Sequence, residues 1–311
     1  MNQAVGLFLK GVAMGAANVI PGVSGGTIAL ITGIYERLIN ALKSGDVAAL
    51  GMILRGRIRD FWLHVDGYFL LWVMAGVFVS IVTLARLFDF LLVNHEVATM
   101  AFFFGLILLS IFYVGKRVSR WTPTAIVALL IGIAIAVTIA LVAPANENNS
   151  TVYLFICGVV AISSMILPGL SGSFVLIVMG NYALVLGAIN TLDLAVLIPL
   201  ALGCVVGLMV FSRVLAWVFA RYHDLTIALM TGFVVGSLVT IWPWKSAVTE
   251  AVVRTGKPDK MVITGYDWFF PALNSQATWV GVALMLIGGA AIWMMEHFAK
   301  GEEPASSSQQ Q

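Results

Sequence analysis

Long apolar segments recur along the chain, separated by short polar or charged stretches. A helix needs about 20 mostly apolar residues to cross the hydrocarbon core of a bilayer. Six segments approach or exceed that length, and we predict that each forms a membrane-spanning helix. They are Tyr68–Leu92, Thr99–Gly115, Thr122–Val142, Leu194–Ala220, Thr226–Trp242 and Thr278–His297.

Two further apolar segments, Val5–Leu42 and Val152–Ile189, are each interrupted by a proline-glycine pair. Proline lacks an amide N–H and glycine adopts unusual dihedrals, so each pair is expected to break a helix. We predict that each segment folds as a re-entrant hairpin, over residues 5–42 and 152–189. The residues that make the breaks are Pro21, Gly22, Pro168 and Gly169.

The two interrupted segments carry the same motif, Pro-Gly-x-Ser-Gly, at residues 21–25 and 168–172. The likeness continues at one constant offset through a glycine, a tyrosine and an aspartate. A second offset aligns several residues of the later spans. The aligned pairs are Gly33 and Gly180, Tyr35 and Tyr182, Asp46 and Asp193, Gly76 and Gly203, Arg86 and Arg213, Thr99 and Thr226, and Gly105 and Gly232.

This internal repetition predicts an all-α integral membrane protein of two repeats. Each repeat contains a re-entrant helical hairpin and three transmembrane helices, so an odd number of crossings inverts the second repeat relative to the first. Residues 1–145 form the first repeat, with an extra interfacial segment at 46–62. Residues 150–299 form the second, and 300–311 are expected to be a disordered cytoplasmic tail.

Basic residues gather on alternate loops, which indicates the orientation, since Lys and Arg favour the cytoplasmic side. We expect both termini to be cytoplasmic. Lys245, Arg254, Lys257 and Lys260 are the exception, because they fall in a loop assigned to the outside. The segment at 46–62 mixes apolar residues with three arginines, which suits either an amphipathic helix at the headgroups or an ordinary basic loop.

The composition agrees with a membrane protein: 60% of the 311 residues are hydrophobic and 10% are charged. A soluble domain carries about 25% charged residues. No basic patch with interleaved aromatic residues suggests a nucleic-acid partner. The two cysteines, Cys157 and Cys204, lie in apolar segments and are expected to be free thiols, and no spacing suggests a metal or another cofactor.

The serine-glycine part of each motif is placed to start a new helix after the break. The first amides of a helix lack intrahelical partners, and the helix dipole is positive there, so such a start can bind a phosphate. The alternative is a plain kink stabilised by neighbouring helices. The candidate phosphate-binding residues are Ser24, Gly25, Gly26, Thr27, Ser171, Gly172 and Ser173.

Arg86 and Arg213 lie inside predicted spans at matching positions of the repeat. An arginine within the bilayer is costly, so it tends to face a cavity or a partner. A guanidinium group binds phosphate through two parallel hydrogen bonds. We predict that both arginines contact a phosphate, whereas the alternative is that they extend to the headgroups.

Six other polar residues lie in or near the interrupted segments. Glu36 is a candidate for coupling transport to an ion, or a partner of Arg37 at the membrane edge. Lys10, Asn18 and Asn181 are candidates for polar support of a ligand or of irregular backbone. Asp46 and Asp193 are expected to cap the helices that follow them.

The stretches Asn18–Thr27 and Leu167–Phe174 resemble a bacterial membrane family that was long a domain family of unknown function and is now associated with undecaprenyl phosphate translocation. The resemblance implies a multi-pass protein of the bacterial cytoplasmic membrane. It also implies a transporter rather than an enzyme. Its partner would be the C55 polyprenyl phosphate lipid, returned from the outer to the inner leaflet for cell-wall synthesis.

Two other functions stay open at this point. Membrane polyprenyl-pyrophosphate phosphatases carry a similar motif, but Gly25 and Gly172 stand where those enzymes have arginine, and the chain has no Glu-x-x-x-Glu motif. A secondary transporter of a small soluble anion would also suit paired helix starts. The sequence leaves coupling to protons or to sodium undecided.

Overall fold

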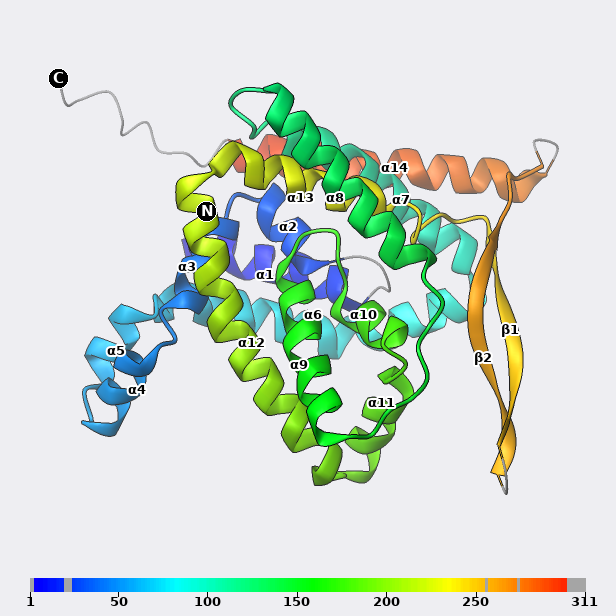
Figure 1. Cartoon of the computed structure of the whole chain (residues 1–311). Coiled ribbons are helices and arrows are strands. Elements are labelled where there is room, and N and C mark those ends of the chain that lie inside the picture. The colour runs from blue at the N-terminus through cyan, green and yellow to red at the C-terminus, as the bar shows by residue number, and fades with distance from the viewer. Residues whose placement is uncertain (1–2, 20–23, 255–256, 273–274, 301–311) are drawn as a thin grey trace.

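The structure is a computed structural model that describes residues 3–19, 24–254, 257–272 and 275–300 (Figure 1). Pro21, Gly22 and residues 301–311 of the predicted tail lie outside these residues. The helices of the first half are α1 (Gln3–Val19), α2 (Gly25–Ile31), α3 (Tyr35–Lys43), α4 (Val47–Leu54), α5 (Ile58–His64), α6 (Gly67–Asn94), α7 (Glu96–Gly115) and α8 (Pro123–Leu141). The elements of the second half are α9 (Thr151–Ile166), α10 (Gly172–Val178), α11 (Tyr182–Thr191), α12 (Leu194–Arg221), α13 (His223–Ser237), β1 (Lys245–Arg254), β2 (Lys257–Trp268) and α14 (Gln276–Lys300).

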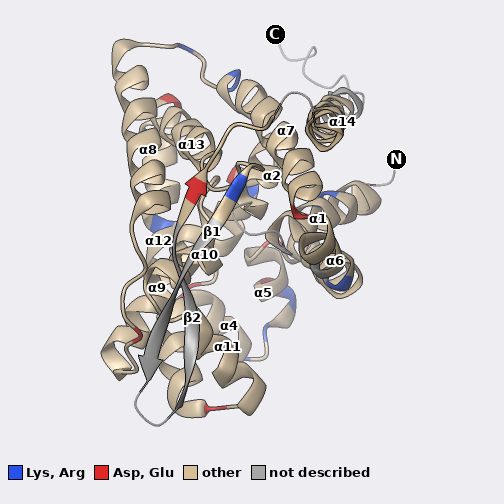
Figure 2. Ribbon diagram, turned by 90° about the vertical axis from the view of Figure 1, so that its right-hand side faces the viewer, with Lys and Arg blue, Asp and Glu red and all other residues tan. Residues whose placement is uncertain are grey.

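Five helices of the described chain, α6, α7, α8, α12 and α14, are long and apolar enough to cross a membrane. They correspond to five of the six predicted spans. Along them few residues are charged (Figure 2).

The predicted span Thr226–Trp242 is wrong in length, because helix α13 ends at Ser237. The Ser237 hydroxyl donates to the Val234 carbonyl, and tighter turns follow it as far as Ile241. Pro243 then disfavours helical backbone at Trp242. At 1.5 Å per residue the 15-residue helix spans about 22 Å. It is short for a span and is mostly buried among its neighbours.

The two halves repeat the same order of helices, apart from α4 and α5 in the first half and the β1–β2 hairpin in the second. Two threonines that the second sequence offset aligns make the same hydrogen bonds. Thr99 donates its hydroxyl to the carbonyls of His95 and Leu91, where α6 meets α7. Thr226 bonds in the same way to Tyr222 and Val218, where α12 meets α13. The aligned threonines therefore fasten equivalent helix junctions.

Four helix pairs form the body of the molecule. Helix α1 packs along α6 and α9 along α12, within each half. The other two pairs join the halves, since α7 packs along α14 and α8 along α13. The side chains of the largest buried cluster among the described residues come from both halves, so the two halves share a core.

Glycines allow these helix pairs to approach closely, as is common in membranes, where helices gain little from burying apolar surface against one another. A β-carbon on Gly105 would overlap the Met285 carbonyl of α14, and one on Gly232 would overlap the Leu129 carbonyl of α8. Both glycines belong to the aligned positions of the repeat, which explains why the sequence keeps glycine at both.

The segment after α3 forms two short helices, α4 and α5, rather than one interfacial helix. Their apolar side chains are strongly exposed: Val47 is 77% exposed, Leu54 78% and Leu63 70%. These helices lie apart from the body in Figure 1. An apolar exposed surface beside arginines suits the boundary of a membrane.

The prediction that the fold contains only helices needs one correction, the antiparallel hairpin β1–β2 between α13 and α14. Both strands contain runs of β-branched residues, which favours strand over helix. The four lysines and arginines that departed from the charge pattern lie on this hairpin.

We predict that Gly105→Ala lowers the free energy of unfolding by about 1–3 kcal/mol, because the added methyl group meets the backbone of α14. Gly187→Ala is the matched control, since a β-carbon there meets nothing within 4 Å. Thermal unfolding in detergent measures both. Equal melting temperatures for the two variants would contradict the close helix contact.

Candidate functional site

The described residues of the two proline-glycine motifs have similar backbone conformations. Ser24 and Ser171 are extended, with φ and ψ of −115° and 132° for the first and −109° and 127° for the second. Each precedes a seven-residue helix, α2 or α10. Both sequence segments therefore break and restart a helix, as the repeat predicted.

A second break follows each short helix, at Gly33 and Gly180. Their φ angles are +75° and +74°, in the left-handed region that favours glycine. Helices α10 and α11 meet at 112° across the second of these breaks. The predicted hairpins therefore contain three helices each, α1 to α3 and α9 to α11, rather than two arms.

The motifs of the two halves contact each other inside the protein. The Gly169 amide donates to the Thr27 hydroxyl at 2.9 Å, and both residues are buried. The Ser24 hydroxyl donates to the Leu167 carbonyl at 3.3 Å, and the Tyr35 hydroxyl donates to the Ile166 carbonyl at 3.0 Å. Groups that a broken helix leaves without partners are thus satisfied by the other half.

In the first motif the amides at the start of α2 already have acceptors. The Gly25 amide donates to Oδ1 of Asn18 at 2.8 Å, and the Gly26 amide donates to the Ser24 hydroxyl at 3.1 Å. The Thr27 amide donates to the Ser24 carbonyl. The sequence predicted open amides here, and the structure shows capped ones.

The second motif differs, because its amides stay open. Within the described residues, no acceptor is found for the amides of Gly172, Ser173 and Phe174. The Ser171 hydroxyl lies 2.9 Å from the Ser173 hydroxyl and does not cap α10. The same sequence pattern therefore builds a closed helix start in one half and an open one in the other.

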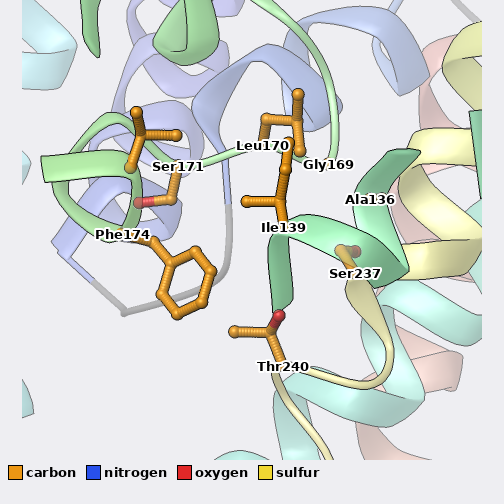
Figure 3. Close-up of a pocket in the computed structure, with 9 residues that line it drawn as sticks. Ala136, Ile139, Gly169, Leu170, Ser171, Phe174, Ser237 and Thr240 are labelled. Carbon is orange, nitrogen blue, oxygen red and sulfur yellow. The ribbon is translucent and has the colours of Figure 1, made fainter. Parts of the chain in front are cut away.

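A small pocket adjoins the second motif (Figure 3). Its space for water is about 10 Å³, close to what one water molecule requires. A phosphate group would need the surrounding helices to separate. The lining residues come from the motif, from α8 and from the end of α13, and include Gly169, Ser171, Phe174, Ile139, Ser237 and Thr240.

The two arginines stand apart from the motifs. Arg86 of α6 is exposed, and Arg213 of α12 donates to the Met209 carbonyl of its own helix. No hydrogen bond among the described residues joins either guanidinium to a motif. Their predicted contact with a phosphate stays a prediction.

The predicted polar supports have distinct partners. Asn181 is fully buried and bonds the backbone of Asn148 from both ends of its amide, so it fastens the chain before α9. Glu36 lies 3.1 Å from Nε2 of His223, whereas Arg37 pairs with Asp66. The predicted Glu36–Arg37 pair is therefore wrong. No group of three or more His, Cys, Asp or Glu among the described residues could hold a metal ion.

Two cations support the α2–α3 break. Nζ of Lys10 donates to the Thr32 carbonyl at 3.0 Å, and Nη2 of Arg117 donates to the Ile31 carbonyl at 2.8 Å. These carbonyls end α2, where the helix dipole is negative and favours cations. A β-carbon on Gly33 would lie 3.3 Å from the Arg117 guanidinium, so the glycine also leaves room for it.

The corresponding carbonyls of the second half have neutral partners. The Ala145 amide donates to the Val178 carbonyl, and the Tyr153 hydroxyl donates to the Met179 carbonyl. In the sequence, Arg117 is only one of the basic residues between the second and third predicted spans. The repeated Gly33 and Gly180 were the available signal that carbonyls nearby would need donors.

The expected caps at the ends of the hairpins are confirmed. Oδ1 of Asp46 accepts from the Ala49 amide at 2.8 Å, and Oδ1 of Asp193 accepts from the Ala195 amide at 3.0 Å. The Ala49 amide lowers the pKa of Asp46 below its ordinary value. Each aspartate starts the helix that follows its hairpin.

We predict that Thr27→Val lowers the free energy of unfolding by about 1–3 kcal/mol, because it leaves the buried Gly169 amide without an acceptor. Thr191→Val is the control, since that hydroxyl is exposed and bonds within its own helix. Denaturant titration in detergent compares them. A Thr27 variant as stable as the control would contradict the contact between the motifs.

A second prediction concerns the ion pair of Arg37 with Asp66, which joins α3 to the start of α6. The hydrogen bonds from Arg37 lower the pKa of Asp66. A lowered pKa stabilises the fold above the ordinary carboxyl pKa of about 4, and the effect fades as the pH falls through the folded value. Asp66→Asn should therefore lower the melting temperature at pH 6, with the difference shrinking towards pH 3. Asp60→Asn, which loses an exposed pair within one turn, is the control. A pH-independent difference would contradict the ionic origin.

The chain is similar in sequence to known membrane transporters. The model of a family described as undecaprenyl phosphate translocase-like matches residues 14–258. A polyprenyl-phosphate transporter of Vibrio cholerae is 38% identical over 94% of this chain and 96% of its own length. One of Staphylococcus aureus is 34% identical over 76% of this chain and 85% of its own. No solved structure matches significantly. The chain belongs to the undecaprenyl phosphate translocase-like family.

Proposed function

We propose that this protein transports undecaprenyl phosphate from the outer to the inner leaflet of the bacterial cytoplasmic membrane, so that the lipid is used again in cell-wall synthesis. Family membership and the names of the relatives support a polyprenyl phosphate substrate. The structural observation that carries the proposal is the buried contact between two helix breaks, with an open helix start beside it.

The phosphate binds at the second motif in this proposal. The amides of Gly172, Ser173 and Phe174 have no acceptor among the described residues, and the hydrogen-bonded hydroxyl pair of Ser171 and Ser173 leaves one hydroxyl able to donate to a ligand. Donors of this kind suit a phosphate oxygen, and the low dielectric of the protein interior strengthens each bond. Ser24, Gly25, Gly26 and Thr27 hold the opposite motif in place and bind the phosphate only if the Asn18 and Ser24 caps open.

The helices support an inverted arrangement of the two repeats. The pairs α7–α14 and α8–α13 exchange with each other when the first half is superposed on the second, as a two-fold relation requires. With an odd number of spans in each half, such an axis lies in the membrane plane. Both termini are then cytoplasmic, as the basic loops indicate.

Alternating access follows from the breaks. Glycine at residues 33 and 180 lets each short helix change direction relative to its neighbours, while the motif contact stays at the centre. Arg86 recruits the phosphate on the outer side and Arg213 receives it on the inner side, since they occupy equivalent positions of opposite repeats. Coupling to protons or sodium would involve Glu36, whose carboxylate meets His223.

We predict that the double variant Ser171→Ala, Ser173→Ala lowers the rate of leaflet transfer about tenfold or more, as expected for losing hydrogen bonds to a charged group. The measurement is transfer of labelled undecaprenyl phosphate across the bilayer of proteoliposomes. Ser44→Ala is the control, because that exposed hydroxyl bonds its own helix. Wild-type rates in the double variant would refute the binding role of the second motif.

The same vesicles test the rest of the proposal. No leaflet transfer by the wild type would refute it, and phosphate release from undecaprenyl pyrophosphate would indicate a phosphatase instead. Uptake of free phosphate without lipid transfer would indicate a small-anion transporter. Unchanged transfer by the Arg86→Ala, Arg213→Ala double variant would refute the roles given to the arginines.

A further inference from the structure

A groove of about 320 Å³ lies between α7, α8 and α13, away from the pocket at the second motif. Its walls are largely apolar and include Ile111, Phe112, Leu129 and Val235. Thr231 also lines it, but its hydroxyl donates to the Ile227 carbonyl of its own helix. The groove therefore suits an apolar ligand, because its walls offer few free polar groups to a polar ligand.

One end of the groove is cationic. Lys116 is the charged residue that lines it, and its Nζ lies 4.1 Å from the centre of the Phe112 ring. Trp121 lines the same end and is 46% exposed. A lysine beside a tryptophan is typical of the headgroup level of a membrane. A lipid with an anionic headgroup would match this groove, with its headgroup at the lysine and its apolar tail along the apolar walls.

The groove and the motif pocket border the same helix pair at different levels. The groove uses Leu129 of α8 and Val235 of α13, whereas the pocket uses Ala136 of α8 and Ser237 of α13. Seven residues of α8 separate the two levels, or about 10 Å by helical rise. A lipid that moves its head between Lys116 and the motif would keep its chain along this helix pair.

We propose that this groove holds the isoprenoid chain of polyprenyl phosphate and that Lys116 binds the phosphate. The groove would then be the docking site of the lipid on the side of the membrane where the 116–122 loop lies. This inference rests on the proposed function and adds a binding site to it. Continuity with the helices of the motif pocket favours the transported lipid over a surrounding phospholipid. Arg117 and Arg120 beside Lys116 make this loop basic.

The test measures lipid binding to the purified full-length protein by native mass spectrometry. The probes are undecaprenyl phosphate, undecaprenol and phosphatidylglycerol. Leu129→Trp fills the groove, and Leu130→Trp is its control, because Leu130 is the adjacent residue of α8 and is 56% exposed. Lys116→Gln removes the charge, and Lys43→Gln is its control at the exposed end of α3.

We expect Leu129→Trp to weaken binding of both isoprenoid lipids about tenfold or more. Lys116→Gln should weaken binding of undecaprenyl phosphate by a similar factor and leave undecaprenol unchanged, since only the phosphate meets the lysine. The two controls should bind like the wild type. Because Lys116 is exposed, its variant stays informative even if the tryptophan variant unfolds.

Three results would overturn the inference. The first is that folded Leu129→Trp binds both isoprenoid lipids as the wild type does. The second is that Lys116→Gln weakens binding of undecaprenol as much as binding of undecaprenyl phosphate. The third is that phosphatidylglycerol binds as well as undecaprenyl phosphate. The last result would identify a phospholipid site. Leaflet transfer in vesicles separates this inference from the proposed function. If the groove variants bind lipid normally while the wild type transports, only the groove inference fails. If the wild type does not transport, the proposed function fails whatever the binding result.

Discussion

The hydrogen bond from the Gly169 amide to the Thr27 hydroxyl marks the constraint on which this fold depends. A helix that breaks inside a membrane protein leaves backbone groups without partners, and the hydrocarbon offers none. Here the two breaks satisfy each other, with Ser24 and Tyr35 reaching carbonyls of the opposite half. The close packing of α7 on α14 and of α8 on α13 brings the halves together at the distance this requires.

The same backbone, used twice, has two different sets of partners. In the first half Asn18 and Ser24 cap the start of α2, and Lys10 and Arg117 cap its end. In the second half neutral groups close the end of α10, and its start stays open. The repeated sequence thus produces a new helix start in both halves, while a residue outside the motif, Asn18, helps to close the amides of the first start.

Much of the fold could be predicted from the sequence because the signals were local. A new helix begins after the serine in both copies of the Pro-Gly-x-Ser-Gly pattern, and the aligned Thr99 and Thr226 fasten equivalent helix junctions. Five spans followed from apolar length alone. The length of α13 did not, because its end at Ser237 and the turns that follow depend on local hydrogen bonds and not on apolar length.

The candidate site was less predictable, because it depends on contacts between distant residues. That Asn18 would occupy the Gly25 amide, or that Arg117 would reach the Ile31 carbonyl, follows from packing and not from spacing. The arginine pair was found by alignment, but alignment gives no direction for a side chain, and Arg213 turns to its own helix. The β1–β2 hairpin was missed because its charged residues were interpreted only as a loop, although both strands carry adjacent β-branched residues.

The most direct test of this account is an experimental structure of the protein in a lipid nanodisc with undecaprenyl phosphate bound. The account predicts phosphate density within about 3.2 Å of the Ser171 or Ser173 hydroxyl, beside an intact contact between Gly169 and Thr27. Phosphate density remote from both motifs, or motifs separated from each other in every bound state, would contradict it.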